Sequence, residues 1–142
     1  MTDAPLVLVE TVGHTMVITL NRPEARNAVN AEVGRLVGAA VTQADEDPEI
    51  RAIILTGSGE QAFSAGADLK AIMKGEPILE PGKEHWSFAG FANHFTSKPT
   101  IAAVNGAAVG AGMNLALGCD VRLAARRARF DTRFLQIGRA HV

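Results

Sequence analysis

The sequence predicts a mixed α/β fold. Short apolar runs rich in β-branched residues, which favour strands, alternate with segments whose apolar residues recur every three or four positions, which favours helices. The order strand, helix, strand occurs over residues 15–56 and again over residues 100–125. Such alternation is typical of α/β proteins, and the length of the chain suits a single domain.

A hairpin and an amphipathic helix open the chain. Residues 6–9 and 15–20 are apolar runs separated by a short segment that contains a glycine, as expected of two strands joined by a tight turn. In residues 29–44 the apolar positions recur at helical spacing. Asn27 or Asn30 is suited to capping this helix, because an asparagine oxygen can accept a backbone N–H at a helix start.

Two later strands are apolar along nearly their whole length. Residues 50–56 contain the run AIIL, and residues 100–104 read TIAAV. Continuous apolar runs are typical of strands covered on both faces, so we expect both strands to be buried in this way. The other expected elements are a short helix over residues 68–73, a helix over 84–96, a helix from 110 to 118 and a strand over 121–125.

The composition argues against several classes of function, although it leaves open a local basic patch. Basic side chains number 14 and acidic ones 15, a net charge of −1, so no excess positive charge is available to bind a nucleic-acid backbone. No apolar run reaches the roughly 18 residues of a membrane span, and no signal peptide is visible. A single cysteine, Cys119, forms neither an internal disulfide nor a zinc site. We therefore expect a cytoplasmic protein with a reduced thiol and no metal.

Two segments rich in glycine and alanine follow predicted strands and precede predicted helices. We call residues 64–68 the first small-residue turn and residues 105–112 the second. Backbone N–H groups at a helix start lack helical partners, and small side chains let a ligand approach them. Two such groups aimed at one oxygen form an oxyanion hole. The alternative is that the small residues only permit close packing. The glycine spacing also departs from the dinucleotide-binding motif G-x-G-x-x-G.

Four motifs in order are similar to those of one protein family. Over residues 6–136 the chain resembles the crotonase superfamily, the enoyl-CoA hydratases and isomerases. This resemblance implies a spiral of repeated β-β-α units, incomplete in this chain. The motifs are Leu20-Asn21-Arg22-Pro23 with Asn27-Ala28, then FSAGADL at 63–69, then KPTIAAVNG at 98–106, then GAG at 110–112 with Leu115-Ala116 and Cys119-Asp120.

The resemblance implies acyl-CoA thioesters as substrates. Two backbone N–H groups, those of Ala67 and Ala111, are then expected to polarise the thioester carbonyl and stabilise its enolate. The family usually has glycine in the place of Ala111, whose N–H still serves if its φ is negative. Coenzyme A is part of the substrate, so no separate cofactor is expected. Family members also lead us to expect a homotrimer or hexamer for the full-length parent protein.

The same resemblance assigns contacts with coenzyme A to two segments. Arg26 and Lys70 also suit its phosphates by their charge, although a solvated surface cation is the alternative for each. The assigned residues are Glu24, Ala25, Arg26, Ala65, Asp68, Leu69 and Lys70.

Two glutamates that activate water in the family's hydratases are replaced in this chain. Asn114 and Phe134 occupy their places. Neither side chain exchanges a proton near neutral pH, so hydration of an enoyl thioester should be slow, although Asn114 can still orient a water or a carbonyl. Asp131 is the carboxylate nearest in sequence to the second lost position, and a turn or strand-end role is its alternative. The resemblance places His85 and His94 in the region that covers the site in relatives, where each could act as an acid or base, and a solvated surface position is the alternative for both.

The end of the chain departs from the family. Residues 137–142 resemble the translation of a sequencing adapter, so we expect them to be a non-native tail and residues 1–136 to be the N-terminal part of an acyl-CoA-binding core. Three functional hypotheses stay open. The chain represents an enzyme acting on thioester enolates, a non-catalytic acyl-CoA-binding protein on the same scaffold, or a gene fragment that is inactive alone.

Overall fold

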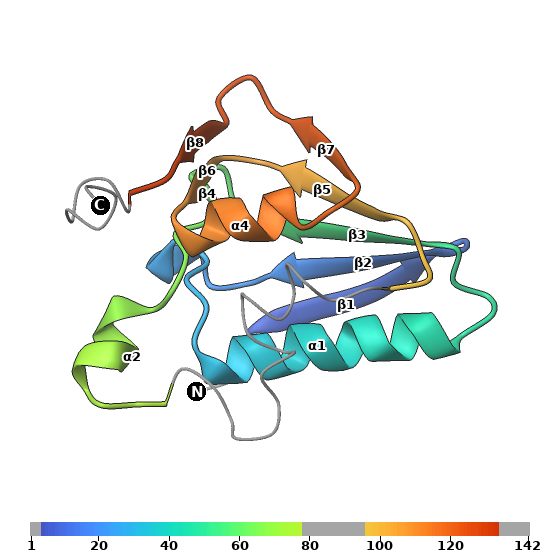
Figure 1. The fold of residues 1–142 in the computed structure, drawn as a ribbon, viewed down its shortest axis with the longest axis horizontal. Helices are drawn as coiled ribbons and strands as arrows, with labels where there is room; N and C mark the ends of the chain where they lie inside the picture. Colours follow the sequence, from blue (N-terminus) through green and yellow to red (C-terminus); the bar gives the residue numbers. More distant parts are fainter. Residues whose placement is uncertain (1–3, 78–95, 134–142) are drawn as a thin grey trace, which may run out of the picture.

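Two sheets and three α-helices make up the part of the chain that the computed structural model describes, residues 4–77 and 96–133 (Figure 1). The expected helix over 84–96 therefore lies almost wholly outside the described residues. The elements are β1 (Val7–Val12), β2 (Thr15–Leu20), the 3₁₀ turn η1 (Pro23–Ala25), α1 (Ala31–Glu46), β3 (Ala52–Gly57), β4 (Ala62–Ser64), α2 (Leu69–Met73), β5 (Thr100–Val104), β6 (Ala107–Val109), α4 (Ala111–Leu117), β7 (Val121–Ala124) and β8 (Arg129–Asp131).

The chain alternates between the two sheets. One is five-stranded in the order β1-β2-β3-β5-β7, and the other is three-stranded in the order β4-β6-β8. Only the β1–β2 pair is antiparallel, whereas every later pair is parallel. Each of β3, β5 and β7 leads directly into a short strand of the second sheet, and a helix follows β4 and β6. This confirms the expected β-β-α spiral, and it brings the starts of α2 and α4 to the same end of the molecule (Figure 1).

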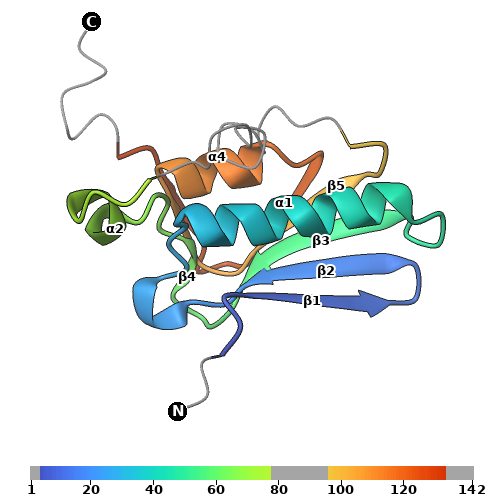
Figure 2. The ribbon, with the colours of Figure 1, turned by 90° about the horizontal axis from the view of Figure 1, so that it is seen from below.

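The hairpin and the long helix form where they were expected. Gly13, with a φ of +60°, makes the tight turn of the hairpin, a conformation that glycine adopts without strain. Asn30, and not Asn27, caps α1, because its Oδ1 accepts the Val33 N–H at 2.9 Å. The helix runs along one face of the five-stranded sheet (Figure 2). It buries Val33, Val37, Ala40, Val41 and Ala44 there.

The core lies on that single face of the sheet. Strand register aligns Met16 with Ile53, and Ile18 with Leu55, and all four are at most 2% exposed. The expectation that the AIIL and TIAAV strands are covered on both faces is wrong. Burial alternates along β3 and β5, because α1 and α4 pack against one face and leave the other partly open to solvent.

A buried asparagine joins two segments that lie far apart in the sequence. The Asn27 side chain is 1% exposed, and its Nδ2 donates to the carbonyls of Ser58 at 3.0 Å and Ala62 at 2.8 Å. Its Oδ1 accepts the Arg22 N–H at 2.9 Å. The residue has a φ of +56°, in the left-handed region that asparagine tolerates better than most side chains. Asn27 therefore holds the segment after β2 against the β3–β4 connection.

Replacing this amide by a carboxylate tests its structural role. In Asn27→Asp, an oxygen would face the two carbonyls that now receive N–H bonds, so we expect a loss of at least ~2 kcal/mol in the free energy of unfolding. The matched control is Asn30→Asp, because an aspartate at a helix start still accepts the N–H and should leave stability unchanged or slightly raised. Chemical denaturation measures both, and equal effects would contradict this assignment.

Exposed apolar residues on β7 predict self-association. This strand ends the five-stranded sheet, and its Val121 and Leu123 side chains are 49% and 64% exposed. An apolar edge strand favours pairing with another chain, so we expect concentration-dependent association in size-exclusion chromatography. Leu123→Lys should reduce it. The control is Val12→Lys, which places the same charge on the opposite edge strand. Equal reductions by both variants would rule out a special role for β7.

Candidate functional site

The two small-residue turns pack directly against each other. A Cβ on Gly112 would lie 2.1 Å from the Ser64 carbonyl oxygen, so no larger residue fits there without movement of the backbone. Gly66 has a φ of +91°, and a Cβ on it would lie 2.8 Å from the Val109 carbonyl oxygen and 3.1 Å from the Ala111 nitrogen. The small residues thus permit close packing, as the alternative reading held. The same packing places the start of α4 beside the first turn.

The first small-residue turn is paired with the chain that follows η1. The Val29 N–H donates to the Gly66 carbonyl oxygen at 2.8 Å, and the Asp68 N–H donates to the Val29 carbonyl oxygen at 3.0 Å. A parallel bridge therefore joins Val29 to Ala67. Ala67's own N–H has no acceptor among the described residues, since the two bonds of this bridge use the groups on either side of it. The bridge therefore leaves the Ala67 N–H unused.

The second expected donor lies at the first residue of α4. Gly110, with a φ of +57°, precedes the helix and accepts the N–H groups of Met113 and Asn114. Ala111 is not among the described non-glycine residues with positive φ, which meets the condition for its N–H to serve as a donor. Its nitrogen adjoins Gly66, the residue before Ala67. The structure therefore brings both expected oxyanion donors to one place.

A cavity of about 520 Å³ opens beside the first turn. It gathers six of the seven residues expected to contact coenzyme A, together with Ala67. Arg26, Ala111 and Asn114 do not line it. Of the lining residues, sequence reasoning gave no ligand role to Arg22, Ala28, Asn30, Ala71, Lys74 and Glu76. The full lining is Arg22, Glu24, Ala25, Ala28, Asn30, Ala65, Ala67, Asp68, Leu69, Lys70, Ala71, Lys74 and Glu76.

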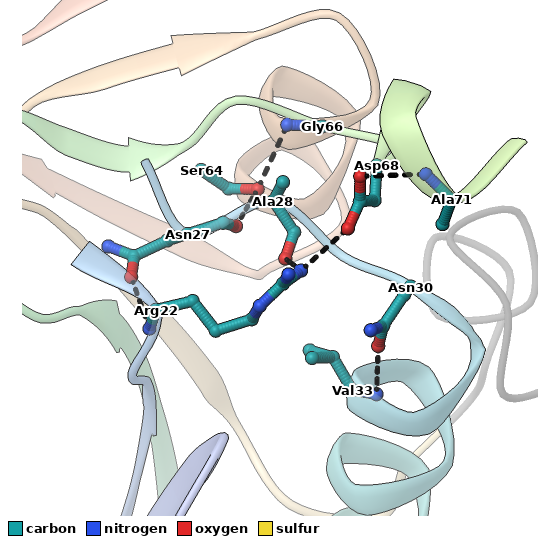
Figure 3. A network of polar contacts seen from close by, with 9 residues as sticks. All are labelled: Arg22, Asn27, Ala28, Asn30, Val33, Ser64, Gly66, Asp68 and Ala71. Atoms are coloured by element: carbon teal, nitrogen blue, oxygen red, sulfur yellow. Dashed lines mark hydrogen bonds and ion pairs between the residues drawn. The ribbon is translucent and has the colours of Figure 1, made fainter. Parts of the chain in front are cut away.

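An ion pair lies in the wall of this cavity. Arg22 Nη1 is 3.0 Å from Asp68 Oδ2, with side-chain exposures of 17% and 12% (Figure 3). Burial acts to raise the pKa of Asp68, but hydrogen bonds from the Ala71 N–H and from Arg22 outweigh it, so the pKa falls below its usual value. Ionised Asp68 therefore stabilises the folded protein. Its contribution is fully present above the ordinary pKa of an aspartate and is lost as the pH falls through the lowered pKa of Asp68.

The remaining candidates stand apart from the cavity lining. Asn114 is exposed on the first turn of α4. Asp131 ends β8, where its carboxylate accepts the Arg133 N–H at 2.9 Å and its carbonyl accepts the Gly110 N–H at 2.8 Å, as in the strand-end role considered for it. Phe134, His85 and His94 lie outside the described residues.

Cys119 is a core residue. Burial raises the pKa of its thiol to about 11, so the thiol stays protonated near neutral pH and is a poor nucleophile. In residues 4–77 and 96–133, no group of three or more histidine, cysteine, aspartate or glutamate side chains is arranged to hold a metal ion. No helix within these same ranges is long and apolar enough to cross a bilayer.

Known proteins match both the sequence and the fold. The chain is 46% identical over 135 residues to a probable enoyl-CoA hydratase, EchA14, of Mycobacterium tuberculosis, covering 93% of this chain and 52% of that protein. It is 39% identical over 130 residues to a short-chain-enoyl-CoA hydratase of Clostridium acetobutylicum, covering 87% and 48% respectively. A solved structure of a carnitinyl-CoA dehydratase from Mycobacterium avium superposes with a TM-score of 0.84 and 56% identity, covering 89% of this chain and 50% of that one.

These matches agree with the motifs and the β-β-α spiral. The chain spans about half the length of the curated relatives it matches. A family model described as enoyl-CoA hydratase/isomerase matches residues 10–141, nearly the whole chain. The chain therefore belongs to the enoyl-CoA hydratase/isomerase family, within the crotonase superfamily.

Proposed function

We propose that this protein binds acyl-CoA thioesters and polarises the thioester carbonyl with the N–H groups of Ala67 and Ala111. The observation that carries the proposal is the contact between the two small-residue turns, which places the Ala111 nitrogen beside Gly66. Two backbone donors fixed near one point suit an oxygen on which negative charge develops. Hydrogen bonds from both donors to that oxygen stabilise the negative charge of a thioester enolate.

The 520 Å³ cavity is the proposed site for the coenzyme A portion. Its wall carries three basic side chains, Arg22, Lys70 and Lys74, and three acidic ones, Glu24, Asp68 and Glu76. Because these charges balance, net attraction does not account for binding of a phosphate group. Phosphate binding then depends on particular side chains, and exposed Lys70 and Lys74 are the candidates.

Names of the relatives support an acyl-CoA ligand without fixing the acyl group. They include a short-chain-enoyl-CoA hydratase and a carnitinyl-CoA dehydratase. Addition of water needs a group that gives or takes a proton, and Asn114 stands where the family has a glutamate. A carboxamide can orient a water or a carbonyl but does not act as a base near neutral pH. We therefore favour enolate stabilisation with little hydratase activity.

A second candidate function is binding of acyl-CoA without catalysis. The observation that favours it is the exposed Asn114 on α4, in place of a carboxylate.

Paired ligands test the proposed oxyanion hole. A thioether analogue of an acyl-CoA keeps the coenzyme A portion but lacks the carbonyl. We expect the thioester to bind about 5- to 30-fold more tightly, since each of two hydrogen bonds contributes about 0.5–1 kcal/mol. Isothermal titration gives both affinities, and backbone amide NMR shifts should move for Ala67 and Ala111 with the thioester only. Equal affinities would contradict the oxyanion hole, and absence of binding by both ligands would contradict the proposed function.

Hydration of crotonyl-CoA tests the proposed lack of a base. Each missing acid or base commonly lowers the rate by about 10²–10⁴-fold, so we expect weak or absent loss of the enoyl thioester absorbance. The double variant Asn114→Glu with Phe134→Glu should raise the rate if the family geometry is retained, whereas Asn114→Gln is the matched control and should not. A rate typical of efficient hydratases in the unsubstituted protein would mean that another residue supplies the base.

A further inference from the structure

One guanidinium nitrogen fastens two chain segments together at the bridge that carries Ala67. Arg22 Nη1 donates to the Ala28 carbonyl at 2.8 Å and to Asp68 Oδ2 at 3.0 Å (Figure 3). Ala28 precedes Val29 on one side of the bridge, and Asp68 follows Ala67 on the other. A donor shared by both sides opposes any sliding of one segment past the other.

The direction of the Ala67 N–H follows from this pairing. Gly66 O accepts the Val29 N–H, so the carbonyl of the peptide unit between Gly66 and Ala67 points toward the partner segment. A trans peptide places its N–H opposite its carbonyl, and the Ala67 N–H therefore points away from Val29. Loss of the bridge would let this peptide unit rotate, and the Ala67 N–H would no longer keep this direction.

Asp68 is the link between Arg22 and that peptide unit. Its Oδ1 accepts the Ala71 N–H at 3.1 Å and its Oδ2 accepts Arg22, so both carboxylate oxygens are engaged (Figure 3). The Asp68 N–H is held by Val29 O at 3.0 Å. Arg22 is itself fixed through its backbone N–H, which donates to Asn27 Oδ1 at 2.9 Å. The chain after Ala67 is thus anchored to a buried asparagine.

We propose that Arg22 is a positioning residue that aims the Ala67 N–H at the thioester oxygen by fastening Asp68 to Ala28. This inference rests on the proposed function. Although Arg22 lines the cavity, its charge is already matched by Asp68 at 3.0 Å and only 17% of its side chain is exposed. Both N–H groups of Nη1 are committed to these two acceptors, so a direct contact with a phosphate would have to use Nε or Nη2. Lysine, with a single compact ammonium on a flexible stem, is a poor substitute for such a bridge.

The test compares affinities for an acyl-CoA thioester and its thioether in Arg22→Gln and Arg22→Lys. We expect Arg22→Gln to reduce the preference for the thioester from about 5- to 30-fold to below ~3-fold, with thioether affinity changed by less than ~2-fold. Arg22→Lys should lie between it and the unsubstituted protein. The control is Arg35→Gln, which removes an exposed ion pair with Glu32 on α1 and should keep the full preference.

Other outcomes separate the possible failures. If the thioether loses affinity as much as the thioester, Arg22 contacts the coenzyme A portion and the positioning role is wrong. It is also wrong if Arg22→Gln keeps the full preference. If the unsubstituted protein shows no preference, the proposed function itself fails.

If circular dichroism shows that Arg22→Gln does not fold, the variant Asp68→Asn is tested instead. Asparagine still caps α2 but lacks the charge that holds Arg22, so the same loss of preference is expected, and a full preference would overturn the role.

Discussion

The arrangement of the candidate site depends on one short parallel pairing, the bridge between Val29 and Ala67. Neither partner belongs to a long strand, and the chain between them includes α1, β3 and β4. Several polar contacts around the bridge make up for its shortness. Ser64 Oγ donates to Asn27 O at 2.9 Å, and Ala65 N–H donates to Arg26 O at 2.9 Å. Ser64 and Asn27 are at most 1% exposed, so the contact between them would be costly to leave unmade.

The two-sheet spiral explains why the candidate donors meet although they are more than forty residues apart. Strands β4 and β6 are parallel neighbours, and each is followed by the start of a helix. Successive β-β-α units therefore deliver equivalent turns to the same edge of the small sheet. Gly66 and Gly112 then allow the backbones to approach to a distance that any Cβ would prevent. The function proposed for this edge needs that approach, because an oxyanion hole requires two donors around one oxygen.

Charge is distributed in two ways around the cavity. Arg22 and Asp68 are largely buried and matched to each other, so they hold the walls in place, whereas Lys70 and Lys74 are exposed. The buried ion pair and the exposed lysines are therefore suited to different roles. In our proposal the inner pair keeps the backbone donors aligned, and the exposed lysines meet a solvated anionic group.

Local patterns in the sequence determined the hairpin, α1, β3, β5, α4 and β7, because periodicity and capping are properties of neighbouring residues. The family motifs predicted the spiral and seven of the thirteen residues that line the cavity. The residue patterns did not predict β4, β6 and β8, which have three residues each and exist only through pairing with distant strands. Tertiary structure also decided between Asn27 and Asn30 as the helix cap, and it gave Arg22 its partners. Those choices depend on contacts such as Arg22 with Asp68, 46 residues apart, which no local pattern encodes.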